Sequence, residues 1–440
     1  MKYRYKPYTY KDTKSKSASF VKLIRRLAIL SLVFISFYTL FLLVGTRPEV
    51  ENVEVLKLIP TEGNYVLNTS SAKIKKAELV IEQEGKSHLV LKEEFPQGTD
   101  RIEIKINSKS IGLKEGKATV RLKLNSGFLR TKQYVLDANV DLTPPSLEVI
   151  SYSRDIRQGS TFAIKVKSDG SKVDLEVNGL KIGMIQIKKN QYFALVPIPL
   201  DGERLEINLT AQDLAGNKTS KSLNLAVRKA YFKKEHIRLT DDFINSVIYP
   251  LLGEEARGLS PEEAFRKINE DWRHKDIQKI SQICKESEPS KLWNGEFIQL
   301  PKSKVISDYG IERFYYYEGK QISYSRHMGY DFASVEQAPV LASNDGVVVF
   351  VGNLGIYGNT IIIDHGLGLF SLYGHLSNTS VKEGQFVKKG EVIGNTGKTG
   401  LAFGDHLHFG IIVHGYEVNP IYWLDARWIK NNIESILERW

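Results

Sequence analysis

The sequence predicts a mainly β protein in which two immunoglobulin-like β-sandwich domains follow one N-terminal transmembrane helix. A helical connector and a C-terminal antiparallel β domain complete the predicted architecture. An 18-residue stretch without charge occupies residues 27–44. Over residues 50–228, apolar and polar residues alternate in short stretches, which is typical of half-buried strands. Apolar residues then take a helical spacing in 236–290, and Gly- and Val-rich strands return in the last third of the chain.

The stretch 27–44 (LAILSLVFISFYTLFLLV) would rise roughly 27 Å as a helix, close to the ~30 Å hydrocarbon core of a bilayer. Residues 1–26 hold nine Lys or Arg residues and one acid, Asp12, which predicts a cytoplasmic N-terminal tail. We therefore expect a single-pass protein of the cell inner (cytoplasmic) membrane, with its C-terminal β domain periplasmic or otherwise extracytoplasmic. A buried helix and a cleaved signal peptide are the alternatives, but no small-x-small cleavage site lies near Gly45.

Composition restricts the chemistry. The formal net charge is +10, and residues 1–26 supply most of it, so the remainder is near neutral and no basic groove for nucleic acid is expected. Cys284 is the one cysteine of the chain. A disulfide within the chain and a cysteine-based zinc site are thereby excluded. Any metal ion must be bound by His, Asp or Glu.

The sequence predicts two β domains in the middle of the chain, 50–143 and 144–228, separated by the turn signal Thr143-Pro-Pro. The ending of the second domain, AQDLAGN at 211–217, resembles a signature common in bacterial immunoglobulin-like domains. Such modules usually serve as spacers or adhesive units, so envelope proteins are candidate partners of these two domains.

Residues 236–290 are expected to form a helical connector. Ser260-Pro-Glu-Glu263 combines a Ser cap, a Pro at the first helical position and a capping-box Glu. Packing is the simpler role for this connector, and a segment that covers the active site is the alternative. A terminal helix is expected over 425–440, with one apolar face made of Trp428, Ile429, Ile433, Ile436, Leu437 and Trp440.

Six of the nine histidines lie between residues 327 and 414. His327 and Asp331 stand in RHMGYD, so a turn could bring both to one ion. His375 stands in YGHL. His406 and His408 stand in DHLHFG and would share one face of a strand. Each motif alone is weak evidence for a site, but together they favour a metal or acid–base site. Two imidazoles and one carboxylate suit a zinc ion with an open fourth position. Neighbouring histidines can transfer protons.

These motifs, together with PVLASNDGVV, GNTIIIDHG and VKKGEVIG, resemble the lysostaphin-type, LytM-domain zinc metallopeptidases. The predicted domain spans 291–424. The resemblance implies a small antiparallel β domain with a groove that binds one Zn2+. It implies His327, Asp331 and His408 as the metal ligands. It also implies that His375 and His406 are catalytic, one as general base and the other as stabiliser of the tetrahedral intermediate.

Together with the predicted membrane anchor, the resemblance implies a membrane-anchored zinc metalloendopeptidase that hydrolyses peptide bonds in peptidoglycan cross-links or stems, for cell-wall remodelling or division. The main alternative is a non-catalytic wall-binding scaffold or an activator of another cell-wall hydrolase, and a third is a peptidase of another protein. The complete set of histidines and aspartate favours the enzyme. One departure from the family is the aromatic stretch 314–317 with the following residues 318–325, which we interpret as a longer loop lining the cleft.

Overall fold

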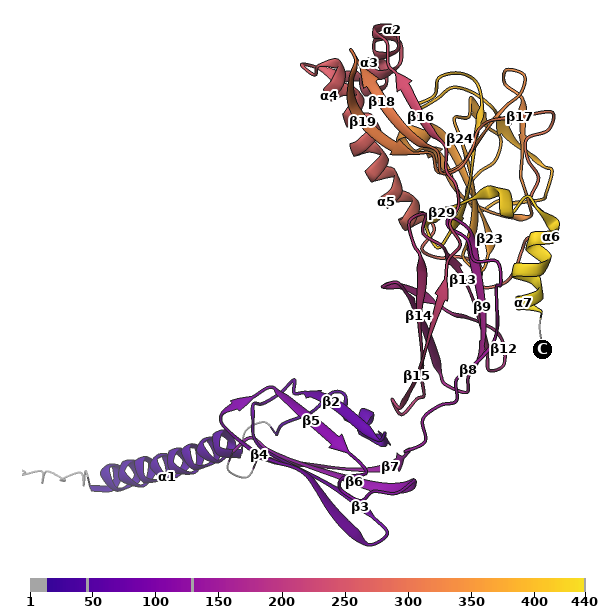
Figure 1. Ribbon diagram of the computed structural model, residues 1–440. Coiled ribbons are helices and arrows are strands. Elements are labelled where there is room, and N and C mark those ends of the chain that lie inside the picture. The colour runs from indigo at the N-terminus through magenta and orange to yellow at the C-terminus, as the bar shows by residue number, and fades with distance from the viewer. Residues whose placement is uncertain (1–13, 45–46, 128–129, 439–440) are drawn as a thin grey trace, which may run out of the picture. The chain divides into compact units, whose positions relative to one another are not determined.

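The computed structural model describes residues 14–44, 47–127 and 130–438, without the side chains of 14–19 and 41–44. The chain forms two compact units (Figure 1). One comprises Met1–Thr143 with Leu214–Asn217, and the other comprises Pro144–Asp213 with Lys218–Trp440. Most of the regular elements are strands, so the prediction of a mainly β protein is confirmed.

The helix α1, Lys14–Val44, includes the stretch expected to cross a membrane. Within it, the charge-free part whose side chains are described is 27–40, which would rise roughly 21 Å against a hydrocarbon core of ~30 Å. None of the described helices is long and apolar enough to cross a membrane. This finding contradicts the predicted transmembrane helix and the predicted inner-membrane localisation with a periplasmic catalytic domain. Residues 1–13 of the expected cytoplasmic tail lie outside the described residues.

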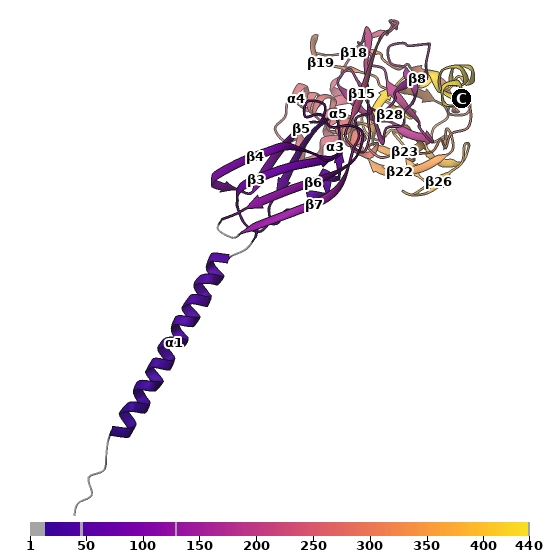
Figure 2. The same ribbon diagram turned by 90° about the horizontal axis from the view of Figure 1, so that it is seen from below.

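The first unit is built on a five-stranded sheet with the order β1-β7-β6-β3-β4 and a two-stranded sheet, β2-β5, which lie side by side in Figure 2. Its period-two pattern is visible in β5, where Ile102, Ile104 and Ile106 are buried and the residues between them are exposed. These buried faces meet in one apolar core. The strands are β1 (Leu58–Ile59), β2 (Glu62–Asn68), β3 (Ile74–Gln83), β4 (Lys86–Thr99), β5 (Arg101–Asn107), β6 (Gly116–Asn125) and β7 (Thr131–Val140).

The second unit begins with two four-stranded sheets, β11-β10-β14-β15 and β12-β13-β9-β8. Their inward residues, such as Phe162 and Leu209, form a core of their own. The strands are β8 (Glu148–Tyr152), β9 (Thr161–Lys167), β10 (Lys172–Val177), β11 (Leu180–Gly183), β12 (Ile185–Lys188), β13 (Gln191–Pro197), β14 (Arg204–Gln212) and β15 (Lys218–Ala226).

The connector that follows is helical after an initial strand, β16 (Lys234–Arg238). β16 pairs in parallel with β18, a strand about 75 residues later in the chain. The capping box predicted at Ser260 is confirmed: its side chain accepts from the Glu263 N–H, and the Glu263 side chain accepts from the Ser260 N–H. The helices are α2 (Asp241–Phe243), α3 (Tyr249–Leu252), α4 (Pro261–Arg266) and α5 (Arg273–Ile283), with π-helical turns at Ile244–Ile248 and Lys267–Trp272.

The last part of the unit is an eight-stranded sheet with the order β17-β20-β28-β24-β23-β22-β26, in which β29 also pairs with β28. The stretch interpreted as a long loop is instead a hairpin, β18 (Glu312–Tyr317) and β19 (Lys320–Arg326), which forms a three-stranded sheet with β16. A tight turn at Glu318-Gly319 closes this hairpin, and both turn residues have positive φ. The other strands are β17 (Lys304–Ser307), β20 (Tyr330–Ala333), β21 (Pro339–Leu341), β22 (Gly346–Asn353), β23 (Asn359–Gly366), β24 (Leu369–Gly374), β25 (Asn378–Thr379), β26 (Phe386–Val387), β27 (Val392–Asn395), β28 (Leu407–Val413) and β29 (Tyr416–Val418).

The C-terminal segment consists of α6 (Ala426–Ile429), a π-helical turn and α7 (Ser435–Leu437). Its apolar face, which includes Ile429 and Ile433, is buried in the core of the eight-stranded sheet. The segment also contacts β9 of the preceding sandwich. It therefore ties the sandwich to the last domain within the second unit.

Candidate metal centre and active site

Strand register brings the predicted site residues together. In the antiparallel pair β20–β28, Asp331 lies opposite His408, and side chains opposite each other project from the same face of the sheet. β24 pairs with the other edge of β28, with Gly374 opposite His408. His375 therefore follows directly at the end of β24, beside His408. His327 lies in the short link between β19 and β20.

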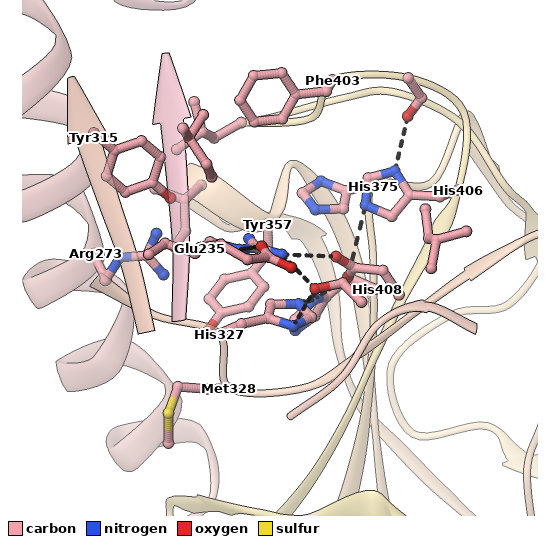
Figure 3. A pocket seen from close by; sticks show the side chains of 18 of the residues that line it. Glu235, Arg273, Tyr315, His327, Met328, Tyr357, His375, Phe403, His406 and His408 are labelled. Atoms are coloured by element: carbon pink, nitrogen blue, oxygen red, sulfur yellow. Dashed lines mark hydrogen bonds and ion pairs between the residues drawn. The ribbon is translucent and has the colours of Figure 1, made fainter. Parts of the chain in front are cut away.

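His327, Asp331 and His408 form a compact cluster of three buried side chains (Figure 3). Asp331 Oδ1 lies 2.9 Å from His327 Nε2 and 2.9 Å from His408 Nδ1, and the two nitrogens are 3.1 Å apart. Burial alone would raise the pKa of Asp331, but the two imidazoles hold it well below its ordinary range. Asp331 is therefore a carboxylate at neutral pH.

The donor set of this cluster fits a divalent cation. His327 Nδ1 donates to the main-chain carbonyl of Asp308 at 2.8 Å, so its Nε2 presents a lone pair towards the carboxylate. Burial lowers the pKa of His408 to about 4, which keeps that ring neutral at pH 7. Lone pairs and a carboxylate oxygen directed at one point repel each other unless a proton or a metal cation lies between them. Two imidazoles and one carboxylate match the ligands of catalytic zinc sites.

His375 and His406 lie beside the cluster in the same cleft, with ring centroids 4.7 Å apart. His375 Nδ1 donates to the carbonyl of Thr399 at 2.7 Å, and His406 Nδ1 donates to the carbonyl of Gly404 at 2.8 Å. Each ring therefore keeps its Nε2 for another partner, and His406 Nε2 is 3.7 Å from Asp331 Oδ1. Burial, reinforced by the neighbouring His406 and His408, lowers the pKa of His375 to about 3, so this ring is neutral and can accept a proton.

Two other residues from the motif region belong to the core. His365 is fully buried, with Nδ1 donating to the Asp345 carbonyl and Nε2 near Ser371 Oγ. Tyr373 is also buried, and its hydroxyl accepts from the Ser343 N–H at 2.7 Å. Neither residue lines the cleft that holds His375 and His406.

Sequence reasoning missed several polar residues of the cleft, among them Glu235, Arg273, Arg313 and Tyr357. Glu235 and Arg313 lie opposite each other in the parallel pair β16–β18. This pairing joins distant parts of the chain and has no local sequence signal. Tyr357 packs its ring against His408 and follows Gly355, whose positive φ marks a tight turn.

The comparison with known protein families agrees with this geometry. Residues 325–420 match the family described as Peptidase family M23. The C-terminal part of this chain is an M23 peptidase domain. The resemblance to lysostaphin-type peptidases is thereby confirmed. All five predicted site residues lie inside the matched M23 range, whereas Glu235 and Arg313 precede it.

Curated relatives match this chain over a limited part of its length. The chain is 47% identical over 95 residues to the DD-carboxypeptidase/endopeptidase Mpg of Neisseria meningitidis, and the match covers 22% of each protein. It is 46% identical over 95 residues to the peptidoglycan DD-endopeptidase ShyA of Vibrio cholerae, again over 22% of each. The chain therefore spans about a fifth of the length of the curated relatives it matches.

Two solved structures are similar to parts of this chain. The catalytic domain of the antimicrobial peptidase lysostaphin from Staphylococcus simulans is 30% identical, and the match covers 30% of this chain and 98% of that one with a TM-score of 0.25. A putative M23 peptidase from Pseudomonas aeruginosa is 19% identical over 62% of this chain and 96% of that one, with a TM-score of 0.41.

Proposed function

We propose that this chain is a zinc metalloendopeptidase that hydrolyses peptide bonds in peptidoglycan cross-links or stems, for cell-wall remodelling or division. The observation that carries the proposal is the buried cluster of His327, Asp331 and His408 beside two further histidines in one cleft. The substrate class rests on the M23 relatives, two of which are named as endopeptidases of the DD type.

The metal-binding residues of the proposed mechanism are His327, Asp331 and His408. When bound there, zinc supplies Lewis-acid polarisation of the scissile carbonyl and increases the acidity of a water molecule. Because both Nδ1 atoms donate to main-chain carbonyls, His375 and His406 offer their Nε2 atoms to the substrate and to water. One of the two, with a free lone pair on Nε2, takes the proton of the attacking water, and the other, when protonated at both ring nitrogens, donates from Nε2 to the oxyanion of the tetrahedral intermediate.

Apolar side chains form part of the lining of the cleft. Leu401, Phe403 and Tyr315 line it together with the histidines, and Phe403 stacks on Phe243 of α2 with ring centroids 4.4 Å apart. Apolar walls strengthen the electrostatic interactions made inside the cleft. A peptide bond held between these walls and the metal-binding cluster is positioned for attack from the side of His375 and His406.

The test is hydrolysis of defined muropeptides by the full chain with zinc, analysed by chromatography and mass spectrometry. We expect fragments from the wild type, none from His408→Ala, and none from the wild type with chelator. The matched control is His274→Ala, because His274 is an exposed histidine on α5, outside the cleft, and it should retain full activity. Failure to cut any peptidoglycan type would contradict the proposal. Wall binding without cleavage would favour the scaffold alternative.

A further inference from the structure

The two carboxylate oxygens of Asp331 have different surroundings. Oδ1 faces His327 Nε2 and His408 Nδ1, each at 2.9 Å. Oδ2 instead faces Arg313, whose Nη2 lies 3.4 Å away. The guanidinium thus contacts the carboxylate oxygen that does not contact the two imidazoles.

Arg313 also contacts Ser307 and Glu235, next to the cluster of His327, Asp331 and His408. The same Nη2 donates to Ser307 Oγ at 2.6 Å, and Ser307 Oγ lies 3.2 Å from His327 Nδ1. Glu235 Oε2 lies 3.7 Å from Arg313 Nε. The Arg313 side chain is 19% exposed, so its charge is balanced mainly by Glu235 and Asp331. One guanidinium therefore reaches behind two of the three predicted metal ligands.

We propose that Arg313 is a positioning residue that makes Asp331 bind the metal ion through Oδ1 alone. This inference rests on the proposed metal centre. With Oδ2 attracted to the guanidinium, the carboxylate cannot rotate to chelate the ion with both oxygens. The fourth coordination position then stays open for water or the scissile carbonyl, as a catalytic site requires.

The chemistry of the side chain explains why an arginine stands here. A planar guanidinium can contact Ser307 and Asp331 at once and keeps its charge at any physiological pH, whereas a lysine offers a single point charge. Removing a group that hydrogen-bonds to a metal ligand typically lowers metal affinity or activity by about 10–100-fold. Arg313→Gln should therefore weaken zinc binding by about that factor, and Arg313→Lys should fall between Gln and wild type.

The arginine comes from a part of the chain that precedes the matched M23 range. It lies on β18, in the three-stranded sheet with β16 and β19, and its position is set by the pairing of Glu235 with Arg313 in register. The hairpin and β16 thus do more than line the cleft. They carry the charge that orients a ligand of the metal centre.

The experiment measures metal binding to the full chain without any substrate. Zinc dissociation constants are obtained by competition with a chromophoric chelator for wild type, Arg313→Gln, Arg313→Lys and Ser307→Ala. The matched control is Lys320→Gln, since Lys320 is an exposed basic residue on the same hairpin that pairs with Glu262. Cobalt(II) alone serves as a second probe, because its visible bands weaken when coordination rises above four ligands.

We expect weaker zinc binding and weaker cobalt bands in Arg313→Gln, a smaller loss in Ser307→Ala, and wild-type behaviour in Lys320→Gln. Thermal melting of the metal-free proteins shows that each variant is folded, and Ser307→Ala keeps the test decisive if Arg313→Gln does not fold. Unchanged zinc affinity and an unchanged cobalt spectrum in the folded variants would overturn the inference. A wild-type protein that binds no zinc would overturn it as well. If zinc binding changes as expected but no peptidoglycan is cut, the positioning role stands and the proposed substrate fails.

Discussion

A carboxyl group behind the candidate metal centre should make the stability of this protein depend on pH near neutrality. Glu417 lies on β29, and its Oε1 accepts from the Tyr357 hydroxyl at 2.8 Å. The Tyr357 ring in turn packs against His408, with centroids 5.2 Å apart. Burial raises the pKa of Glu417 to about 7, although the hydrogen bond from Tyr357 and the charge of Arg273 act in the opposite direction.

The sign and size of this pH dependence follow from the difference in proton affinity of Glu417 between the folded and the unfolded protein. A carboxyl whose pKa rises from its ordinary 4.5 to about 7 on folding binds its proton more tightly in the folded state. Stability is therefore greatest below pH 4.5 and falls as pH rises through 7, where the buried group must ionise. Each tenfold change in proton affinity is worth about 1.4 kcal/mol, so the total loss is about 3 kcal/mol. Glu417→Gln keeps an acceptor for Tyr357 and removes this loss.

The assay is urea unfolding of metal-free wild type and Glu417→Gln at pH 5, 7 and 9. The difference between the two proteins isolates Glu417, because the other titrating groups are shared. We expect the variant to be more stable by about 1 kcal/mol at pH 5 and by about 3 kcal/mol at pH 9. Glu286→Gln is the control for the loss of one carboxylate, since Glu286 is exposed.

The opposite pattern would refute the reasoning. If Glu417→Gln were less stable than wild type at pH 9, the ionised carboxylate would be a net favourable partner of Arg273. Burial would then be the weaker effect, and Glu417 would belong to a stabilising ion pair. A difference that stayed constant from pH 5 to pH 9 would mean that the group does not titrate in this range.

Three further outcomes are expected. Trp423→Ala should lower the free energy of unfolding by about 3–5 kcal/mol in urea titrations, because this fully buried ring contacts Trp293 and Phe297. Gly329→Ala should weaken zinc binding in chelator competition, because a Cβ there would lie 2.6 Å from the His408 ring. Ser260→Ala should cost about 1 kcal/mol in urea titrations by removing the capping box of α4.

Much of the candidate site could be predicted from the sequence, because the residues that identify it stand close together in short motifs. His406 directly precedes β28 and His408 lies in it two residues later. The HxxxD spacing places His327 and Asp331 within one turn and the strand that follows it. The strand-like segments between these motifs were long and regular enough to predict a β domain. The structure adds the register of Asp331 opposite His408, which the sequence could not fix, because register depends on partners distant in the chain.

Other features depended on contacts that have no local signature. The aromatic stretch 314–317 was interpreted as a loop because its strand partners were not evident, yet it forms the centre of a three-stranded sheet. The pairing of Glu235 with Arg313 joins strands about 75 residues apart. Arg313 and Glu417 are ordinary charged residues in the sequence, and only burial and neighbours give them their roles. Position in space, not residue type, distinguishes them from other charges.

The helical connector is part of the same physical unit as the M23 domain. Its apolar residues Phe265 and Ile268 share a buried cluster with Tyr357 and with the sheet residues Ile362 and Phe370. Asp276 of α5 accepts from the Ile356 N–H at 2.8 Å, next to Gly355, where any side chain would collide with that carboxylate. The helix therefore holds the loop that places Tyr357 against His408. These helices pack against one face of the eight-stranded sheet. The apolar core that supports the site therefore includes residues before 291, where the predicted domain begins, and before 325, where the matched M23 range begins.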